Sequence, residues 1–400
     1  MSLNRALEGL RVLDFSQVGA GPACGMLLSD MGADVVKIEA PGGDIGRKLG
    51  PPWQQGESVV SMSFNRNKRS IVLDLKKPEA VAAARRLAAA ADVVLESFRP
   101  GVMEKLGLGY ARLSEDHARL VFCSVSAYGQ SGPWRDKPGV DGIIQAVSGL
   151  MSLIGEEGAP PMKVQTPAAD ITTGFLATIA VLAALRERER TGRGQQLDVS
   201  LYNSALMLQQ SALASYLCDG EKPQRSGSAA PYSAPNEAYP TKDGWIQIGA
   251  YHEDRWRRFC EVIGDPALAA RDEFATNPKR VANRVRLADV VAQRLSKKTT
   301  AEWQALLEAA DILCAPIADY DELMRSPQLA HNGVIVEMQH PSAGKVRMPG
   351  FAVGDREAQS RVRRPPPRIG EHAREVLAEF GFPQTEVDAL IASGAVKEGP

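Results

Sequence analysis

One aspartate lies where an apolar segment begins, and its position indicates either chemistry or helix capping. Asp170, in T-P-A-A-D-I-T-T-G (166–174), is the only charged residue between Lys163 and Arg186. A carboxylate is ionised at neutral pH, so it can attack a carbonyl carbon without a general base. The same side chain at a helix start can instead accept backbone N–H bonds, and the helix end would lower its pKa. On these residues alone, the capping role is favoured.

A second candidate for chemistry is the glycine-containing turn V-G-A-G-P-A-C-G (18–25). It lies between a predicted strand and a predicted helix, and Glu39 stands 20 residues after Gly19. This spacing is close to a dinucleotide-binding fingerprint, which would indicate an NAD-dependent oxidoreductase. However, Cys24 occupies the place of the third glycine, and Pro22 lacks a backbone N–H for a phosphate. Close packing of a strand and a helix is therefore favoured over NAD binding.

The cysteines and histidines predict neither a disulfide framework nor a metal site. The five cysteines are isolated, without a C-x-x-C pair, as expected in a reducing compartment. The five histidines show no H-x-x-x-H or H-E-x-x-H spacing, so no metal site is predicted. Cys24, near the first turn, could be a reactive thiol, but a small buried side chain is the favoured interpretation.

The composition is that of a globular chain without a nucleic-acid partner. Its 400 residues, 44% of them hydrophobic, can bury a large core and predict about two domains. The 47 Lys and Arg residues against 48 Asp and Glu give a formal net charge of −1, with no long basic run. Glu8, Arg11 and Asp14 interrupt the region where a signal peptide would be apolar, and no run of 18 consecutive apolar residues occurs. We therefore expect a cytoplasmic protein with no membrane partner and a small ligand.

Short apolar strands alternate with helical patterns through the first half of the chain. This alternation predicts a parallel sheet with right-handed crossovers, in a Rossmann-like α/β domain. The predicted strands cover 11–15, 33–39, 70–75, 92–97 and 120–125, with another inside 191–201, and the predicted helices cover 21–31, 78–91, 110–118 and 142–153, followed by the segment after Asp170 and a long helix ending at Leu217.

A polar linker, D-G-E-K-P-Q-R-S-G-S-A-A-P (219–231), precedes a second and smaller unit. There, residues 237–250 predict a β-hairpin that turns at Asp243, and helical patterns follow. A second hairpin and a terminal helix are expected further on. The sequence thus predicts a large α/β domain over 1–218 and a linker with a smaller α+β domain over 219–325.

Six blocks of sequence carry a family resemblance. They are L-E-G-L-R-V-L-D-F-S-Q-V-G-A-G-P, G-A-D-V-V-K-I-E-A-P-G-G-D, N-R-N-K-R-S-I-V-L-D-L-K, A-D-V-V-L-E-S-F-R-P-G, T-G-R-G-Q-Q-L-D-V-S and P-P-P-R-I-G-E-H. In this order they closely resemble the class III CoA-transferases, the family of formyl-CoA transferase, with the 2-methylacyl-CoA racemases as relatives. The resemblance implies that residues 326–400 return to the large domain and that two ring-like chains interlock as a homodimer.

The resemblance also places the catalytic aspartate of the family at Asp170, which reverses the preference for capping. In similar enzymes this carboxylate displaces CoA from an acyl-CoA to give a mixed anhydride, and the thiolate returns to give an aspartyl-CoA thioester. An acceptor acid then repeats these steps in reverse. Effective molarities of about 10⁵–10⁸ M outweigh the weaker nucleophilicity that a lowered pKa would cause. The implied substrates are an acyl-CoA and a small carboxylic acid, with no tightly bound cofactor.

The turn after the first strand matches the loop that meets the thioester in similar proteins. The resemblance implies catalytic roles for Gln17 and Gly19 and CoA contacts for Val18 and Ala20. Backbone amides of this loop would stabilise an oxyanion. One well-known branch of the family has glutamine in place of Gly19, so a side-chain role of that glutamine is absent here.

Later segments match the nucleotide-binding loops of the family and a further loop close to CoA. Their matching residues are Leu73, Lys76, Ser97, Phe98, Arg99, Lys105, Lys137 and Asp141. The resemblance implies that Phe98 packs against adenine and that Lys76 and Lys105 meet phosphates. A half-buried aromatic and solvated lysines are the structural alternatives. Ala40 replaces an arginine found in some members, which removes one proposed contact.

Two rival functions stay open beside transfer. Racemases of the family pair an aspartate with a histidine in a G-H-D motif, because each face of the α-carbon needs its own acid or base. Here the residues are Gly139, Val140 and Asp141, and valine cannot move a proton. The other rival is a CoA-binding protein without catalysis, against which the intact Asp170 argues.

The acceptor acid is predicted from the segment R-S-G-S-A-A-P-Y-S-A-P-N. Formyl-CoA transferases carry a glycine-rich substrate loop in the corresponding region, whereas this segment has few glycines, which disfavours oxalate. Resemblance to members that use succinyl-CoA favours that donor with a small dicarboxylate or hydroxy acid. Arg225 and Tyr232 are candidate contacts of this loop, and a plain linker is the alternative.

Overall fold

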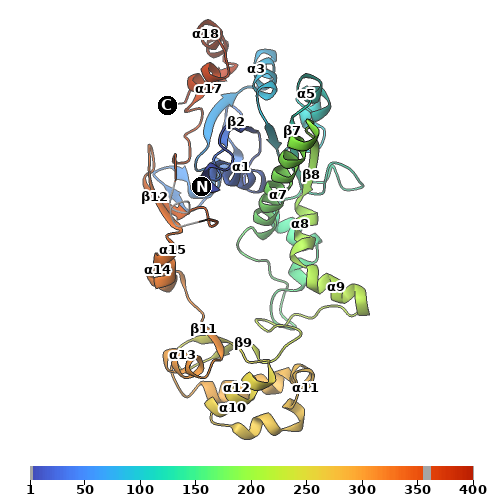
Figure 1. The fold of residues 1–400 in the computed structure, drawn as a ribbon, viewed down its shortest axis with the longest axis vertical. Coiled ribbons are helices and arrows are strands. Elements are labelled where there is room, and N and C mark those ends of the chain that lie inside the picture. The colour runs from blue at the N-terminus through green and yellow to red at the C-terminus, as the bar shows by residue number, and fades with distance from the viewer. Residues whose placement is uncertain (1–2, 355–361, 400) are drawn as a thin grey trace. The chain divides into compact units, whose positions relative to one another are not determined.

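Figure 1 presents the computed structural model, which describes residues 3–354 and 362–399. The chain divides into two compact units, and the first joins the stretches Met1–Met151, Lys163–Glu221 and Pro327–Pro400. The second holds Ser152–Met162 and Lys222–Ser326. Unit 1 therefore combines segments from the N-terminal and C-terminal parts of the chain.

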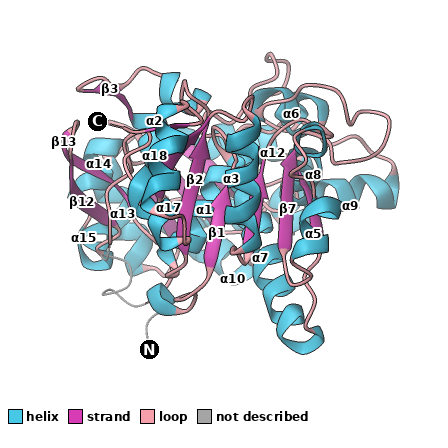
Figure 2. Cartoon of the chain, turned by 90° about the horizontal axis from the view of Figure 1, so that it is seen from above, coloured by secondary structure: helices cyan, strands magenta, loops and turns pink. Residues whose placement is uncertain are grey.

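A seven-stranded sheet with the order β14-β5-β2-β1-β6-β7-β8 forms the centre of unit 1 (Figure 2). Its strands are β1 (Arg11–Asp14), β2 (Asp34–Glu39), β5 (Arg69–Leu73), β6 (Val93–Glu96), β7 (Val121–Ser126), β8 (Gln196–Ser200) and β14 (Val396–Lys397). All pairs from β5 to β8 are parallel, and only the short edge strand β14 is antiparallel to its neighbour. The predicted α/β class with a parallel sheet is confirmed.

Helices flank this sheet. Those of unit 1 are α1 (Ala20–Asp30), α2 (Val59–Ser63), α3 (Pro78–Ala89), α4 (Val102–Lys105), α5 (Tyr110–Asp116), α6 (Asp141–Val147), α7 (Ala168–Thr191), α8 (Leu201–Leu208), α9 (Gln210–Asp219), α15 (Pro327–Asn332), α17 (Ala373–Glu379) and α18 (Gln384–Ala392). The predicted helix over 142–153 is shorter, and the helix ending at Leu217 is broken at Gln209.

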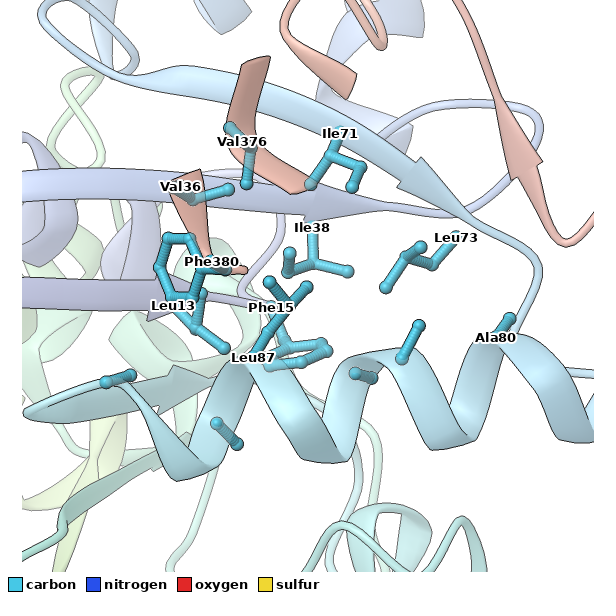
Figure 3. Close-up of a cluster of buried hydrophobic side chains, with 14 of the residues drawn as sticks. Leu13, Phe15, Val36, Ile38, Ile71, Leu73, Ala80, Leu87, Val376 and Phe380 are labelled. Atoms are coloured by element: carbon cyan, nitrogen blue, oxygen red, sulfur yellow. The ribbon is translucent and has the colours of Figure 1, made fainter. Parts of the chain in front are cut away.

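Side chains along each strand point alternately to the two faces of the sheet, and both faces are buried under helices. On one face, Leu13 and Ile71 pack in a cluster with Leu87 of α3 and Val376 of α17 (Figure 3). On the other face, Val12 packs in a second cluster with residues of α1 and α7. The sheet is thus the middle of three layers, which fixes the positions of its loops.

Helix α7 is long and apolar enough, by length and composition alone, to cross a membrane. It packs on α1, α8, β7 and β8 within unit 1, and core helices of globular units meet the same criteria. The two helices lie close together at Gly174, where an added Cβ would lie 2.7 Å from Ala23 Cβ and 3.0 Å from the Ala20 carbonyl oxygen. A glycine is therefore required for α7 to lie this close to α1.

Unit 2 combines a small antiparallel sheet with a helical layer. Its elements are β9 (Asn236–Pro240), β10 (Trp245–Gly249), β11 (Leu313–Pro316), α10 (Glu253–Val262), α11 (Asn277–Ala282), α12 (Arg284–Leu295), α13 (Thr300–Ala309) and α14 (Tyr320–Arg325). β9 and β10 form the predicted hairpin. The core of this unit includes Tyr239, Trp256 and Phe259, and the helices bury it against one face of the sheet.

The remaining strands of unit 1 form two hairpins. They are β3 (Trp53–Gln54), β4 (Glu57–Ser58), β12 (Ile335–His340) and β13 (Gly344–Pro349), and the second hairpin confirms the one predicted after the small unit. The C-terminal segment then returns to the central sheet, where Val396 pairs with Leu73.

Candidate active site

The strand order reverses between β1 and β6, and the loops that follow these two strands meet there. The turn after β1 contains Gln17, whose N–H donates to Ser97 Oγ, just after β6, at 2.9 Å. In open parallel sheets, ligands bind in the crevice outside the carboxyl ends of the strands at such a reversal. The topology therefore points to this crevice as the ligand site of unit 1.

Asp170 reaches this crevice because α7 packs on α1, the helix that begins after the same turn. A Cβ added at Gly19 would lie only 2.5 Å from Asp170 Oδ2. The missing side chain at Gly19 thus lets the backbone of the turn approach the carboxylate. A larger residue would have to displace one or the other.

Asp170 does not take the alternative role of capping its own helix. Asp170 is the third residue of α7, and Pro167 is the N-cap residue. The cap comes instead from Asp141, whose Oδ1 accepts the N–H of Ala169 at 2.8 Å and that of Asp170 at 3.4 Å. No hydrogen bond to the Asp170 side chain exists among residues 3–354 and 362–399, so this carboxylate is not occupied by capping.

The expectation that a helix end lowers the pKa of Asp170 is wrong. Burial, and to a smaller extent the nearby charge of Asp141, together raise the pKa of this carboxyl to about 7. These two effects outweigh the helix end because no donor neutralises the Asp170 oxygens. A carboxylate with a higher pKa is a stronger nucleophile, and near pH 7 a substantial fraction of it is ionised.

Two adjoining pockets form around the turn, and Gln17 lines both. The first has a volume of about 210 Å³ and is lined by Gln17, Val18, Gly19, Ala20, Gly21, Ser97, Val125, Ser126, Ala127, Gly139, Val140, Asp170 and Leu201. The second has a volume of about 230 Å³ and is lined by Phe15, Gln17, Ile38, Glu39, Ala40, Pro41, Leu73, Asp74, Leu75, Lys76, Phe98 and Leu106. One pocket offers a carboxylate and the other an apolar wall with an exposed lysine, which suits a ligand with a reactive end and a flat end.

A family model described as CoA-transferase family III matches residues 7–373. The chain belongs to this family. It is 36% identical to the succinyl-CoA:glutarate CoA-transferase of Mus musculus, over 98% of this chain and 91% of the relative. It is 38% identical to the succinate–glutarate CoA-transferase of Agrobacterium fabrum, over 94% of this chain and 95% of the relative. Matches of this extent make the protein a CoA-transferase.

Solved structures agree with this assignment. A CAIB/BAIF family protein from Brucella suis superimposes with a TM-score of 0.82 at 33% identity, over 94% of this chain and all of the other. An aspartate-to-alanine mutant of Rv3272 from Mycobacterium tuberculosis superimposes with a TM-score of 0.83 at 34% identity, over 93% and 98% of the two chains. The dinucleotide alternative for the first turn is therefore abandoned.

The structure also gives a local reason why this CoA-transferase does not use the turn for a dinucleotide. Glu39, which would have to hold a ribose, is buried and paired with Arg47, and it accepts a hydrogen bond from Ser70. Burial alone would raise the pKa of Glu39, but these partners lower it to about 2. Cys24 is fully buried and burial raises the pKa of its thiol to about 12, so it is an unreactive core residue.

Several predicted CoA contacts come together and others do not. Val18, Ala20 and Ser97 line the pocket of Asp170, whereas Leu73, Lys76 and Phe98 line the second pocket. Arg99 and Lys105 are exposed and line neither.

Two further predicted CoA contacts, which stay predictions, interact with other protein groups. Lys137 lies over the ring of Trp134, with Nζ 4.5 Å from the ring centroid. Asp141 caps α7, as described above, and also accepts a hydrogen bond from Gln145 Nε2 at 2.6 Å. Within the described ranges, no group of three or more His, Cys, Asp or Glu residues is arranged to hold a metal ion.

Other residues of the site were not predicted. Ser126 and Leu201 line the pocket of Asp170 because they lie at the ends of β7 and β8. Two buried charged residues beside the turn, Lys37 and Asp44, were also missed. Lys37 could have been found, since it interrupts the apolar strand A-D-V-V-K-I-E, where a charge needs a specific partner.

Proposed function

We propose that this CoA-transferase moves CoA from succinyl-CoA to a small dicarboxylic or hydroxy acid, with Asp170 as the covalent nucleophile. Relatives support the donor and the acceptor class by their names. Beside the two glutarate enzymes, a succinyl-CoA:mesaconate CoA-transferase of Haloarcula hispanica is 34% identical. A succinyl-CoA–D-citramalate CoA-transferase of Chloroflexus aurantiacus is 33% identical.

The proposed reaction needs no proton transfer. An Asp170 oxygen attacks the thioester carbonyl carbon of the donor, and the C–S bond breaks. CoA departs as the thiolate, and Asp170 and the donor acyl group are now joined in a mixed anhydride. The thiolate then attacks the Asp170 carbonyl carbon, and the donor acid departs with one oxygen that belonged to Asp170. The acceptor carboxylate displaces CoA from the aspartyl thioester, and the returning thiolate releases acceptor-CoA. Asp170 is restored with one oxygen from the acceptor.

The observation that carries this proposal is the environment of the Asp170 carboxylate. It lines a pocket, accepts no hydrogen bond from a described residue, has a pKa raised to about 7, and lies against the glycine turn that begins α1. The first turn of a helix carries partial positive charge and amides that suit a developing oxyanion. Gln17 and Gly19, which border this position, are the proposed catalytic partners of Asp170.

The second pocket is the proposed place of the CoA nucleotide. Leu73 and Phe98 give it an apolar wall of the kind that packs against adenine, and Lys76 lies exposed at its lining. The exposed side chains of Arg99 and Lys105 are free to reach phosphates in solution. Because Gln17 lines both pockets, the pantetheine arm would pass this residue on its way to Asp170.

Recognition of a second carboxylate on the acceptor needs a cation that the Asp170 pocket lacks. Among the described residues lining that pocket, none is basic. In unit 2, the buried Nη1 of Arg225 has no hydrogen-bond partner within residues 3–354 and 362–399, and Tyr232 has an exposed side chain. By the family resemblance of their loop, Arg225 and Tyr232 stay the proposed acceptor contacts.

The proposal includes a homodimer of interlocked chains, supported by apolar side chains that one chain leaves exposed. Phe175 and Ile179 lie one helical turn apart on α7, with exposed fractions of 50% and 60%. Helix α9, whose residues the structure describes in full, has no buried residue although it carries Leu213 and Leu217. Apolar patches of this kind are typical of protein interfaces, and a second copy of the chain would cover them.

The test incubates the protein in D₂O with succinyl-CoA, 2-methylacyl-CoA and a panel of small carboxylic acids, and follows every CoA ester by mass spectrometry. Transfer predicts new CoA esters of dicarboxylic or hydroxy acids without carbon-bound deuterium. Deuterium at the α-carbon without new esters would instead establish racemisation, for which the exposed Val140 provides no acid or base. New esters with monocarboxylic acids only would overturn the acceptor class.

A further inference from the structure

The backbone of the turn that follows β1 is held by side chains. The N–H of Ser16 donates to Asp14 Oδ1 at 2.9 Å. The N–H of Gln17 donates to a serine hydroxyl, as described above. The N–H of Val18 donates to both carboxylate oxygens of Asp44, at 3.1 and 3.3 Å. Three successive amides are therefore fixed by side chains from three different segments.

Val18, at the end of this series, has a φ of 66°. This left-handed conformation is disfavoured for residues with a Cβ, and most of all for β-branched ones. Such a conformation persists only when surrounding groups hold it, and it is concentrated at functional sites. The next residue is Gly19, which lies against Asp170. The conformation of Val18 thus sets where the backbone meets the nucleophile.

Asp44, which holds the Val18 amide, belongs to a buried ion pair. Its Oδ2 lies 2.8 Å from Lys37 Nζ, and the two side chains are only 2% and 1% exposed. Lys37 Nζ also donates to the Ser16 carbonyl oxygen at 2.8 Å. Burial lowers the pKa of Lys37, but the carboxylates of Asp14, Asp44 and Glu39 outweigh it and raise the pKa. Lys37 therefore stays charged, and the two side chains hold the turn at two backbone atoms, the Val18 nitrogen and the Ser16 carbonyl oxygen.

A buried ion pair seldom adds net stability, because the cost of desolvating two charges offsets their attraction. Stability alone is thus a weak reason for this pair beneath a strained turn. We propose that Asp44, fixed by Lys37, is a positioning residue that holds Val18 in its left-handed conformation and thereby places Gly19 and the first turn of α1 against Asp170. This inference rests on the proposed role of Asp170 as nucleophile.

The first test is the substitution Asp44→Ala. Without the Asp44 carboxylate, the Val18 N–H loses its acceptor, so Val18 can leave its left-handed conformation and the backbone can move away from Asp170. Displacements of about 1 Å at a reacting centre cost about 10²-fold in rate. We expect kcat to fall by this factor, while KM for the acyl-CoA changes by less than about threefold, because the second pocket is untouched. Asp44→Asn keeps an oxygen acceptor for the Val18 amide and should retain more of kcat than Asp44→Ala.

A double-mutant cycle with Val18→Gly separates positioning from a general structural role. Glycine adopts a positive φ without strain, so the conformation of the turn depends less on the hydrogen bond to Asp44. Asp44→Ala should therefore reduce kcat less in the Val18→Gly background than in the wild-type background, and the two fold-reductions should differ by about tenfold. Equal losses in both backgrounds would overturn the proposal.

The matched control is Asp30→Ala, which also removes a buried carboxylate from an ion pair, with Arg66, at the far end of α1. Both variants leave a buried cation unpaired, but Asp30 does not contact the turn. We compare the hydrogen–deuterium exchange of the peptide that covers residues 11–24. Its exchange should be faster than in the wild type in Asp44→Ala and equal to the wild type in Asp30→Ala. The control should keep the wild-type kcat.

The exchange measurement does not depend on activity, so the two proposals fail separately. If the wild-type protein transfers CoA to none of the acids, the proposed function fails, and the exchange comparison still decides whether Asp44 holds the turn. If the wild-type protein transfers CoA, and Asp44→Ala has wild-type kcat and wild-type exchange in this peptide, the positioning role is wrong.

Discussion

A carboxylate nucleophile reacts only in its ionised form, so the proton on Asp170 controls the proposed reaction. Burial and the charge of Asp141 raise the pKa of Asp170 to about 7. The carboxylate that caps α7 is therefore also the one that makes the nucleophile more basic. Neither effect follows from the order of residues, because Asp141 lies 29 positions before Asp170.

The first prediction concerns pH. The kcat/KM for transfer should rise with pH and be half-maximal near 7, since the protonated form of Asp170 is inactive. Asp141→Asn keeps an oxygen acceptor for the helix amides but removes the negative charge, so it should shift this midpoint to lower pH. The measurement is a pH–rate profile of both proteins from about pH 5 to 9. An unshifted midpoint in Asp141→Asn would contradict the contribution of the Asp141 charge to the pKa of Asp170.

The second prediction concerns Gly19, where an added Cβ would lie 2.5 Å from Asp170 Oδ2. Gly19→Ala should lower kcat by about 10²-fold because it displaces the nucleophile or the turn. Its thermal unfolding midpoint should stay close to that of the wild type. The matched control is Gly42→Ala, another loop glycine, where the nearest atom to an added Cβ is Lys48 Nζ at 3.9 Å. Equal activity of the two variants would contradict the close approach.

At the scale of elements, the strands and helices were predictable and their contacts were not. Apolar periodicity marked β1, β2, β5, β6 and β7, because buried parallel strands are continuous apolar runs. The break between α8 and α9 at Gln209 left no glycine or proline as a signal. The hydrogen bond from the Val18 N–H to Asp44 was not predictable either, because it joins two residues that lie 26 positions apart and that only the fold brings together.

The third prediction tests the packing of α1 on α7. Alanine in place of a helix-interior glycine normally stabilises a protein by about 0.5–1 kcal/mol. At Gly174 the added methyl group would meet Ala23 and the Ala20 carbonyl, so Gly174→Ala should instead destabilise by about 1–3 kcal/mol. It should also lower kcat, because it moves Asp170 away from the turn.

The control for this prediction is Gly142→Ala in α6. An added Cβ there meets only Lys163 Cδ, at 3.9 Å, so the ordinary gain of a helical alanine should appear. Denaturant unfolding of both variants gives the two signs. Stabilisation of both would mean that the helices can separate without cost.

At the scale of the whole molecule, periodicity does not tell which separate segments of the chain join one compact unit. A polar linker at 219–231 marked the start of a smaller unit, but nothing in the pattern placed Ser152–Met162 in that unit. Such a segment is held by tertiary contacts, for example the hydrogen bond from the Gly227 N–H to the Gly155 carbonyl at 3.0 Å. The acceptor acid is likewise a property of a few side chains, which the fold alone does not specify.

The fourth prediction concerns self-association. Leu217, with 74% of its side chain exposed on α9, should lie in the proposed interface between two chains. Leu217→Glu should therefore weaken the dimer, because an interface must desolvate the new charge. Thr385→Glu introduces the same charge at an exposed position of α18 and is the control. Sedimentation equilibrium should show monomers for the first variant and dimers for the second, and equal dimerisation of both would place the interface elsewhere.

The central claim, that Asp170 carries the acyl and CoA groups covalently, is tested most directly with a carboxylic acid acceptor labelled with ¹⁸O. In the proposed mechanism each turnover leaves one acceptor oxygen in the Asp170 carboxylate. After turnover with succinyl-CoA, mass spectrometry of the peptide containing residues 164–186 should show ¹⁸O at Asp170. Asp170→Asn, treated in the same way, should show neither label nor turnover. Full turnover by the wild-type protein with no label at Asp170 would contradict the account.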